Sequence, residues 1–258
     1  MISHQTTLFD GEAIIPRKKG QPARSRTNDA NSKTYSNEAL NEYLQKTGAA
    51  LIGDELRLQV LKDSSAHFAL LFYRGNSELL NKRIVSVVGT RGPSAQGIEN
   101  ANRITKLLSD LGFIVMSGLA KGIDTVAHRA AFEAGNTTIA VLGTPIHKVY
   151  PAENKGLAEE IAKKGLLLSP SLPHEEHGHY LFPRRNRLMA LLSEATIIIE
   201  AGPTSGVVHQ AAECLRQGRK LILLKPIADN RDLPWIPGFI KSGAKVTETP
   251  ADLKKILL

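Results

Sequence analysis

The chain has 258 residues, 42% of them hydrophobic, and 33 Lys and Arg against 25 Asp and Glu give a formal net charge of +8. This length allows one large α/β domain, or one domain with a smaller addition, and the composition excludes a chain that is disordered throughout or built from low-complexity repeats. The single cysteine, Cys214, excludes an intramolecular disulfide and favours the cytoplasm, and no apolar run reaches the ~18 residues of a membrane-spanning helix.

The first 80 residues contain two segments that differ in hydrophobic periodicity. Residues 1–35 lack hydrophobic periodicity and are predicted to form a disordered basic tail, with six basic residues and one acidic residue between Arg17 and Lys33. Such a tail can contact phosphates without folding, and a merely solvated tail is the alternative. Residues 36–80 are predicted to form a short helical preface, because Leu40, Tyr43 and Leu44 repeat at helical spacing and so do Phe68, Leu71 and Phe72.

Residues 81–258 alternate short β-branched apolar runs with helical stretches, at intervals that fit a strand, a crossover helix and the next strand. The runs are continuously apolar, which is typical of strands covered on both faces. We therefore predict an α/β, Rossmann-like doubly wound, mostly parallel sheet with helices on both faces. A final helix is expected from Thr249 to Leu258. The predicted strands are Ile84–Val88, Phe113–Met116, Thr138–Leu142, Leu166–Leu168, Thr196–Ile199, Leu221–Leu224 and, less regularly, Ala244–Thr247.

Glycine turns follow three of these strands, at the edge where ligands of doubly wound sheets bind. They run from Gly89 to Ser94, from Ser117 to Asp124 and from Glu200 to Gly206. Glycine lets backbone approach a phosphate closely, and Arg91 and Lys121 add positive charge. These turns predict a track for several phosphates.

Two other phosphate sites are excluded. The turns lack the GxGxxG spacing and the acidic second-strand end of a dinucleotide site, and no GxxxxGK[ST] loop occurs. The run Pro183–Arg187 carries three arginines ahead of an apolar helix predicted over Leu188–Leu192. Cations at a helix start oppose the helix dipole unless an anion compensates, which favours phosphate binding by this run.

Several motifs occur together in one order: Tyr73-x-Gly75-Asn76, Gly89-Thr90-Arg91-x-Pro93-Ser94, Ser117-Gly118-Leu119-Ala120-Lys121-Gly122-Ile123-Asp124, Tyr150-Pro151-x-Glu153-Asn154, Phe182-Pro183-Arg184-Arg185-Asn186-Arg187 and Glu200-Ala201 followed by Ser205-Gly206. In these motifs the sequence, over about residues 70–225, resembles the DNA-processing protein A family (DprA, also called Smf). The resemblance implies a Rossmann-like domain at 81–258 that binds single-stranded DNA without sequence preference. It also implies a homodimer that protects incoming strands in natural transformation and loads the RecA recombinase, with no enzymatic activity, no cofactor and no metal.

Position by position, the resemblance implies a DNA-binding set made of Arg91, Gly118, Lys121, Gly122, Arg184, Arg185, Asn186, Arg187, Ser205 and Gly206. The sequence departs from the family pattern at Val207–Val208 and Lys225–Pro226. Because only about thirty residues follow Pro226, we expect a divergent member without the C-terminal winged-helix-like module of the family.

Four other features have alternative readings. Asp124 and His128 stand four residues apart and form a candidate acid-base pair, or Asp124 serves the helix dipole while His128 packs. The residues His174, His177 and His179 are candidate metal ligands, or part of a solvent loop, which we prefer. Cys214 and Trp235 are expected to pack rather than react or stack on a base.

The alternative function is a phosphoribohydrolase-like enzyme on a small nucleotide, for which Glu200 is the one carboxylate near the expected place.

Overall fold

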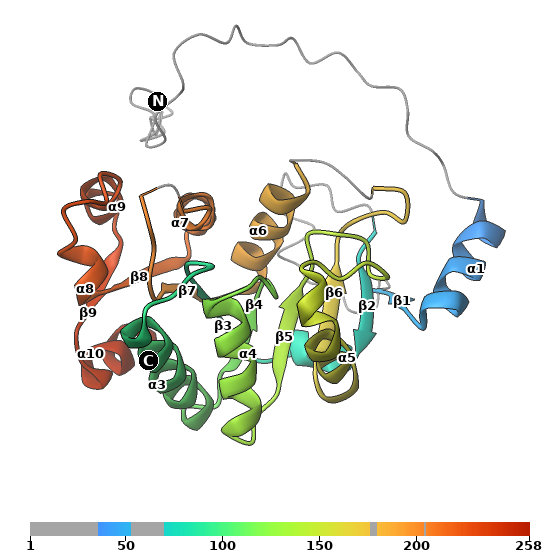
Figure 1. Ribbon diagram of the computed structural model, residues 1–258, viewed down its shortest axis with the longest axis horizontal. Coiled ribbons are helices and arrows are strands. Elements are labelled where there is room, and N and C mark those ends of the chain that lie inside the picture. Colours follow the sequence, from blue (N-terminus) through green and yellow to red (C-terminus); the bar gives the residue numbers. More distant parts are fainter. Residues whose placement is uncertain (1–35, 53–69, 176–179, 204) are drawn as a thin grey trace, which may run out of the picture.

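The computed structural model describes residues 36–52, 70–175, 180–203 and 205–258. These residues form one nine-stranded sheet flanked by helices (Figure 1). The strands are β1 (Ala50–Leu51), β2 (Phe72–Gly75), β3 (Ile84–Val88), β4 (Ile114–Ser117), β5 (Thr138–Val141), β6 (Leu166–Ser169), β7 (Ala195–Ile198), β8 (Lys220–Leu224) and β9 (Lys245–Thr247). The helices are α1 (Asn37–Thr47), α3 (Ala95–Asp110), α4 (Ile123–Glu133), α5 (Lys155–Lys164), α6 (Leu181–Leu192), α7 (Val207–Arg216), α8 (Lys225–Ala228), α9 (Ile236–Lys241) and α10 (Pro250–Leu257), with 3₁₀ turns η2 (Ser77–Asn81) and η3 (Ala152–Asn154).

The strand order is β1-β2-β6-β5-β4-β3-β7-β8-β9, and all pairs are parallel except β1 with β2 and β2 with β6. From β3 the chain proceeds outward through β4, β5 and β6, then returns to the other side of β3 as β7. The strand order therefore reverses between β3 and β7. In doubly wound sheets, ligands bind in the crevice beyond the carboxyl ends of the strands at this switch point.

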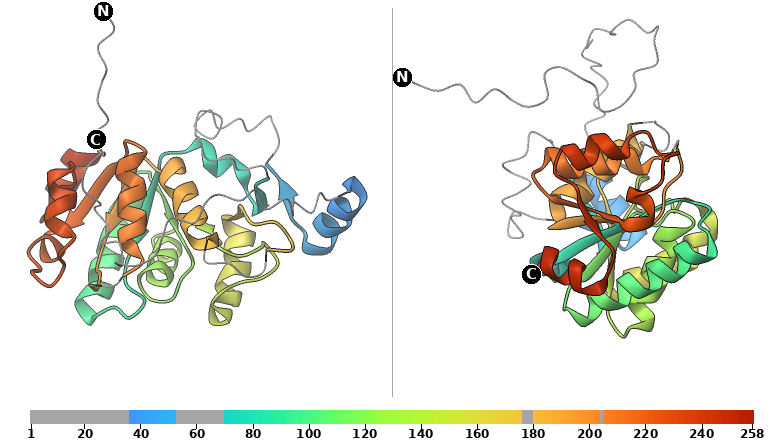
Figure 2. Two further views of the ribbon diagram at one scale, coloured as in Figure 1. Left: turned by 90° about the horizontal axis from the view of Figure 1, so that it is seen from above. Right: turned by 90° about the vertical axis from the view of Figure 1, so that its left-hand side faces the viewer.

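Alternate residues of each strand pack into opposite layers, as the period of a strand requires. Ile84 and Val88 of β3 join a core with Leu188 of α6 and Cys214 of α7. Val85 and Val87 of the same strand, by contrast, pack with residues of α3, α4 and α10. The end-on view in Figure 2 shows the two helical layers on either side of the sheet.

The predicted α/β doubly wound fold is confirmed, and all seven predicted strands are found within one residue of their expected limits, as β3 to β9. The final helix is confirmed too. Thr249 accepts a hydrogen bond from the backbone N–H of Asp252, while the Asp252 carboxylate accepts one from the backbone N–H of Thr249, which completes a capping box.

The helical prediction for Leu71, Phe72 and Tyr73 is wrong. The helix of the preface ends at Thr47, and Phe72–Gly75 is strand β2, which pairs antiparallel with Leu166–Ser169. Phe72 is fully buried and packs edge-on against Tyr43 of α1, so long-range contacts override the local spacing. Phe68 and the tail from Arg17 to Lys33 lie outside the described residues, and a domain boundary at residue 80 stays a prediction.

The helix after the arginine run begins at Leu181 rather than at Leu188, so the run lies inside α6. No helix among the described residues is long and apolar enough to cross a membrane.

Candidate nucleic-acid interface

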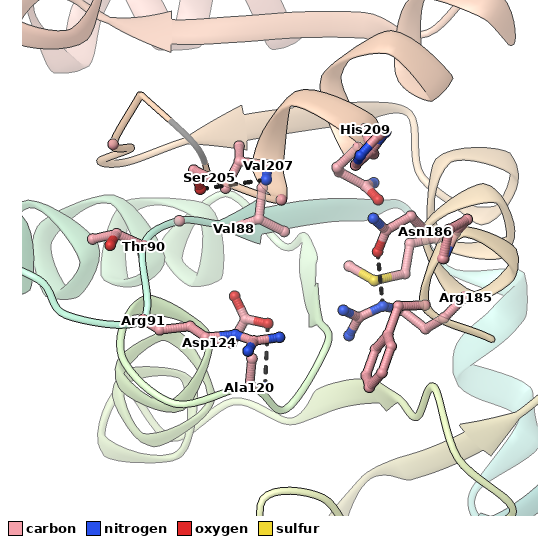
Figure 3. Close-up of a pocket in the computed structure, with 17 residues that line it drawn as sticks. Val88, Thr90, Arg91, Ala120, Asp124, Arg185, Asn186, Ser205, Val207 and His209 are labelled. Carbon is pink, nitrogen blue, oxygen red and sulfur yellow. Dashed lines mark hydrogen bonds between the residues drawn. The ribbon is translucent and has the colours of Figure 1, made fainter. Parts of the chain in front are cut away.

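A cavity of about 450 Å³ lies at the switch point between β3 and β7. Figure 3 shows Arg91 and Asp124 on one side of this cavity, Arg185 and Asn186 facing them, and Ser205 and Val207 on a third side. It is lined by Val88, Gly89, Thr90, Arg91, Ala120, Asp124, Phe182, Pro183, Arg185, Asn186, Met189, Gly202, Ser205, Gly206, Val207, His209 and Gln210.

The turn after β3 is packed against the start of α4. Gly122 has φ +84, and a Cβ there would lie 2.4 Å from the carbonyl oxygen of Thr90. The same carbonyl accepts a hydrogen bond of 3.1 Å from the backbone N–H of Ile123. Gly122 is thus required by the contact between two turns and not by an approaching ligand. The contact leaves Arg91 exposed at the cavity rim, where its guanidinium has no carboxylate partner among the residues that the structure describes.

The turn after β4 is already filled by a carboxylate of the chain itself. Asp124 accepts hydrogen bonds from the backbone N–H groups of Gly118 (3.1 Å) and Ala120 (3.3 Å). Leu119, between them, adopts φ 55, the left-handed region that L residues rarely occupy, and the Asn154 side chain donates to its carbonyl at 3.0 Å. Because Asp124 occupies these donors, the turn does not offer them to a phosphate.

Arg185 reaches across from α6 and is the most constrained cation of the site. Its Nη1 donates to the carbonyl oxygens of Gly118 (2.6 Å) and Val141 (3.3 Å), and its Nε donates to Oδ1 of Asn186 (2.8 Å). Burial raises the pKa of the Asp124 carboxyl, although the nearby Arg185 guanidinium opposes the shift. Burial also lowers the pKa of Arg185, with Asp124 acting in the other direction. The two opposite charges therefore stabilise each other at the cavity wall.

The third predicted turn carries Glu200, which serves the start of α3. Its carboxylate accepts from the backbone N–H of Ser94 (3.1 and 3.2 Å) and from the Ser94 hydroxyl (2.8 Å). Ser94 in turn caps α3 by accepting from the backbone N–H of Gly97 (3.0 Å). Glu200 is not part of the cavity lining.

The N-terminus of α7 lines the cavity with Ser205, Gly206 and Val207. Gly206 is its N-cap, its first turn contains no acidic residue, and within the described part of the chain the N-cap residue supplies no side-chain cap. The Ser205 hydroxyl accepts only a long bond of 3.4 Å from the N–H of Val207. The positive end of this helix therefore faces the cavity together with Arg91 and Arg185.

The other three predicted cations form ion pairs with carboxylates of the protein. Arg184 pairs with Glu175 and donates to the Ser171 hydroxyl at 3.2 Å, and Arg187 lies 3.3 Å from a carboxylate oxygen of Glu213. Lys121 forms an exposed ion pair of 3.3 Å with Glu153. Neither Arg184 nor Arg187 lines the cavity. The structure thus brings Arg91, Arg185, Asn186, Ser205 and Gly206 together, with Gly118, Lys121 and Gly122 behind or beside them.

Helix geometry explains this division of the arginine run. Phe182, Arg185, Asn186 and Met189 share one face of α6 at spacings of three and four residues, and all four line the cavity. Phe182, Met189, His209 and Gln210 also line the cavity, although the sequence motifs did not predict them as site residues. The spacing within α6 was the available signal, and it was lost because the helix was predicted to begin seven residues too late.

The other sequence candidates pack as parts of the core. His128 Nδ1 lies 2.8 Å from the Thr138 hydroxyl, so His128 and Asp124 bond to different partners. Cys214 is a buried free thiol, and Trp235 is 6% exposed and packs edge-on to Phe239 with ring centroids 5.7 Å apart. Of the histidine group only His174 lies among the described residues, and Glu175 beside it is bound by Arg184.

The family model and the curated relatives indicate one family. The model of a family described as DNA recombination-mediator protein A matches residues 50–257. A DNA processing protein DprA of Bacillus subtilis is 39% identical over 154 residues, which are 59% of this chain and 52% of that protein. The chain thus spans about half the length of this curated relative.

Two solved structures share the fold. DNA processing protein A from Streptococcus pneumoniae superposes with a TM-score of 0.76 at 33% identity, over 86% of this chain and 78% of that one. DNA processing protein A from Helicobacter pylori, studied for its single-stranded DNA binding mode, superposes with a TM-score of 0.72 at 23% identity, over 81% of this chain and 95% of that one.

Proposed function

This chain belongs to the DNA recombination-mediator protein A family, and from that premise we propose that it binds single-stranded DNA without sequence preference, as a binding protein and not as an enzyme. The observation that carries the proposal is the pair of arginines, Arg91 and Arg185, that face one crevice at the switch point beside the positive end of α7. The single-stranded DNA binding mode described for the Helicobacter pylori protein, which shares this fold, supports the same class of ligand.

We assign the phosphate contacts to Arg91, Arg185 and the Ser205–Gly206 turn, with Asn186 at a sugar or base edge. Lys121 extends the basic surface, because an exposed ion pair such as Lys121 with Glu153 contributes little and can exchange partners. Gly118 and Gly122 act indirectly, by admitting Arg185 and by packing the two turns. Arg184 and Arg187 act through their carboxylate partners, which fix α6.

The salt dependence of binding tests the proposal. Each phosphate neutralised on a single strand contributes about 0.7 to the magnitude of the slope of log affinity against log salt, so contacts by the three cations Arg91, Arg185 and Lys121 give a slope of about −2. Arg91→Ala is expected to reduce the slope by about 0.7, because it removes one contact. Arg129→Ala is the matched control, an exposed arginine of α4 away from the cavity. A parent affinity that does not change with salt would refute the proposal.

The hydrolase alternative depends on Glu200, and the hydrogen bonds of this carboxylate to Ser94 argue against a catalytic role. The test is to incubate the protein with nucleoside monophosphates and to measure the release of free base. We expect none. Release that Glu200→Gln abolishes would instead establish the enzyme.

The finer roles that the family implies are also proposals: a homodimer, a cytoplasmic location, a part in natural transformation and the loading of RecA recombinase. Sedimentation of the full chain tests the dimer. An assay of RecA filament formation on strands already covered by a single-strand-binding protein tests the loading, and an unchanged filament rate would remove that role.

A further inference from the structure

A second, smaller cavity of about 260 Å³ adjoins the first. It is lined by Arg91, Gly118, Ala120, Lys121, Gly143, Tyr150, Pro151, Glu153, Phe182 and Arg185. Arg91, Ala120, Phe182 and Arg185 line both cavities, so the two are neighbours along one surface. A strand that passes Arg91 and Arg185 therefore meets the second cavity next.

Tyr150 is the exposed aromatic side chain of this second cavity. It follows β5, at the same edge of the sheet, and keeps 55% of its surface exposed. Its ring lies edge-on to Phe182, with centroids 6.2 Å apart and planes at 62°. Among the described residues its hydroxyl has no hydrogen-bond partner. One ring is thus held by its neighbour while its remaining surface is open to solvent.

Tyr180 is a second exposed tyrosine, but its hydroxyl and ring both contact other side chains of the protein. Tyr180 is 54% exposed, but its hydroxyl donates to Glu175 at 3.1 Å and the Arg184 guanidinium lies 5.7 Å from its ring centroid. It lines neither cavity. The difference between the two tyrosines is that Tyr150 has open ring surface inside a basic groove, where Arg91, Arg185 and Lys121 are the neighbouring cations.

We propose that Tyr150 is a stacking platform for one nucleobase of the bound strand, in the second cavity, with Arg91 and Arg185 holding the adjoining phosphates. This inference rests on the proposed function and adds to it a contact with a base. Every base has a π-face, so a stacking contact strengthens binding without introducing sequence preference. The chain then binds single strands by stacking as well as by charge.

The test compares two strands of equal length and charge, an oligothymidylate and the same backbone with abasic sites throughout. The variants of the full-length protein are Tyr150→Ala, Tyr150→Leu, which keeps an apolar side chain without a ring, and Tyr150→Phe, which keeps the ring. Tyr180→Ala is the matched control. Thermal unfolding of each variant verifies that it is folded.

We expect Tyr150→Ala and Tyr150→Leu to bind oligothymidylate about tenfold more weakly than the parent, the loss that one base stack causes. Their affinity for the abasic strand should change less than twofold, and Tyr150→Phe should restore binding of oligothymidylate. Equal affinities of parent and Tyr150→Leu for oligothymidylate, or equal losses on both strands, would overturn the stacking role alone. A parent that binds neither strand would overturn the proposed function as well.

Discussion

The glycine turn at Gly118 has two explanations, close packing against Arg185 or close approach of a DNA phosphate, and Gly118→Ala tests them. Its backbone is not in the left-handed region, so alanine introduces no backbone strain. A Cβ at this position, however, would lie 1.6 Å from Nη1 of Arg185 and 2.9 Å from a carboxylate oxygen of Asp124. The guanidinium has to leave, because nothing can approach a Cβ so closely.

The cost follows from the contacts that are lost. Arg185 gives up its 2.6 Å hydrogen bond to the Gly118 carbonyl and the longer one to Val141. A hydrogen bond from a charged group contributes about 1.5–3 kcal/mol to stability. The buried Asp124 also loses its nearby opposite charge, which adds to the cost. We therefore expect Gly118→Ala to lower the free energy of unfolding by about 2–4 kcal/mol.

For a domain of this size that loss corresponds to a decrease in Tm of about 5–15 °C, measurable by calorimetry or circular dichroism. The matched control is Gly92→Ala in the neighbouring turn, where a Cβ meets no atom within 4 Å and the change should stay within about 0.5 kcal/mol. If Gly118 serves only to admit a DNA phosphate, Gly118→Ala will weaken binding while Tm stays at the parent value. That outcome would refute the role assigned to Arg185.

Three further outcomes are expected. Arg184→Ala should lower the free energy of unfolding by about 1–3 kcal/mol, since it leaves the largely buried Glu175 carboxylate without its cationic partner. If Arg184→Ala instead reduced the salt slope of DNA binding as much as an Arg91 variant does, its structural role would be contradicted. Burial lowers the pKa of His128 to about 3, so the unfolded chain binds more protons than the folded protein below pH 6.5, and stability falls as pH decreases. Between pH 7 and 5 the free energy of unfolding of the parent, measured by urea titration, should fall by about 2 kcal/mol more than that of His128→Gln. Parallel losses in the two proteins would exclude His128 as the cause. Burial raises the pKa of the Cys214 thiol to about 11, so a thiol reagent at pH 8 should react with the native protein at least tenfold more slowly than in urea, and equal rates would show that the thiol is accessible.

The sequence was sufficient for the parallel part of the fold because its strands are covered on both faces. The run Ile84–Val88, for example, is apolar at every position but Ser86 and buried along its whole length, and that pattern is independent of which strands become neighbours. The final helix was equally readable, since Thr249 and Asp252 form a capping box within four residues. Strand β2 was not readable, because Phe72 becomes a strand residue only by pairing with β6, almost one hundred residues later.

For the candidate site, the sequence by itself located the segments: three glycine turns at strand ends and a run of three arginines. It could not assign their donors and charges, because these depend on contacts between segments distant in the chain. Tertiary structure decided that the backbone donors of one turn bind Asp124 and that the start of α3 binds Glu200. It also decided that Arg185 enters the crevice while Arg184 does not, because successive residues of a helix point about 100° apart and only one face of α6 meets the sheet edge.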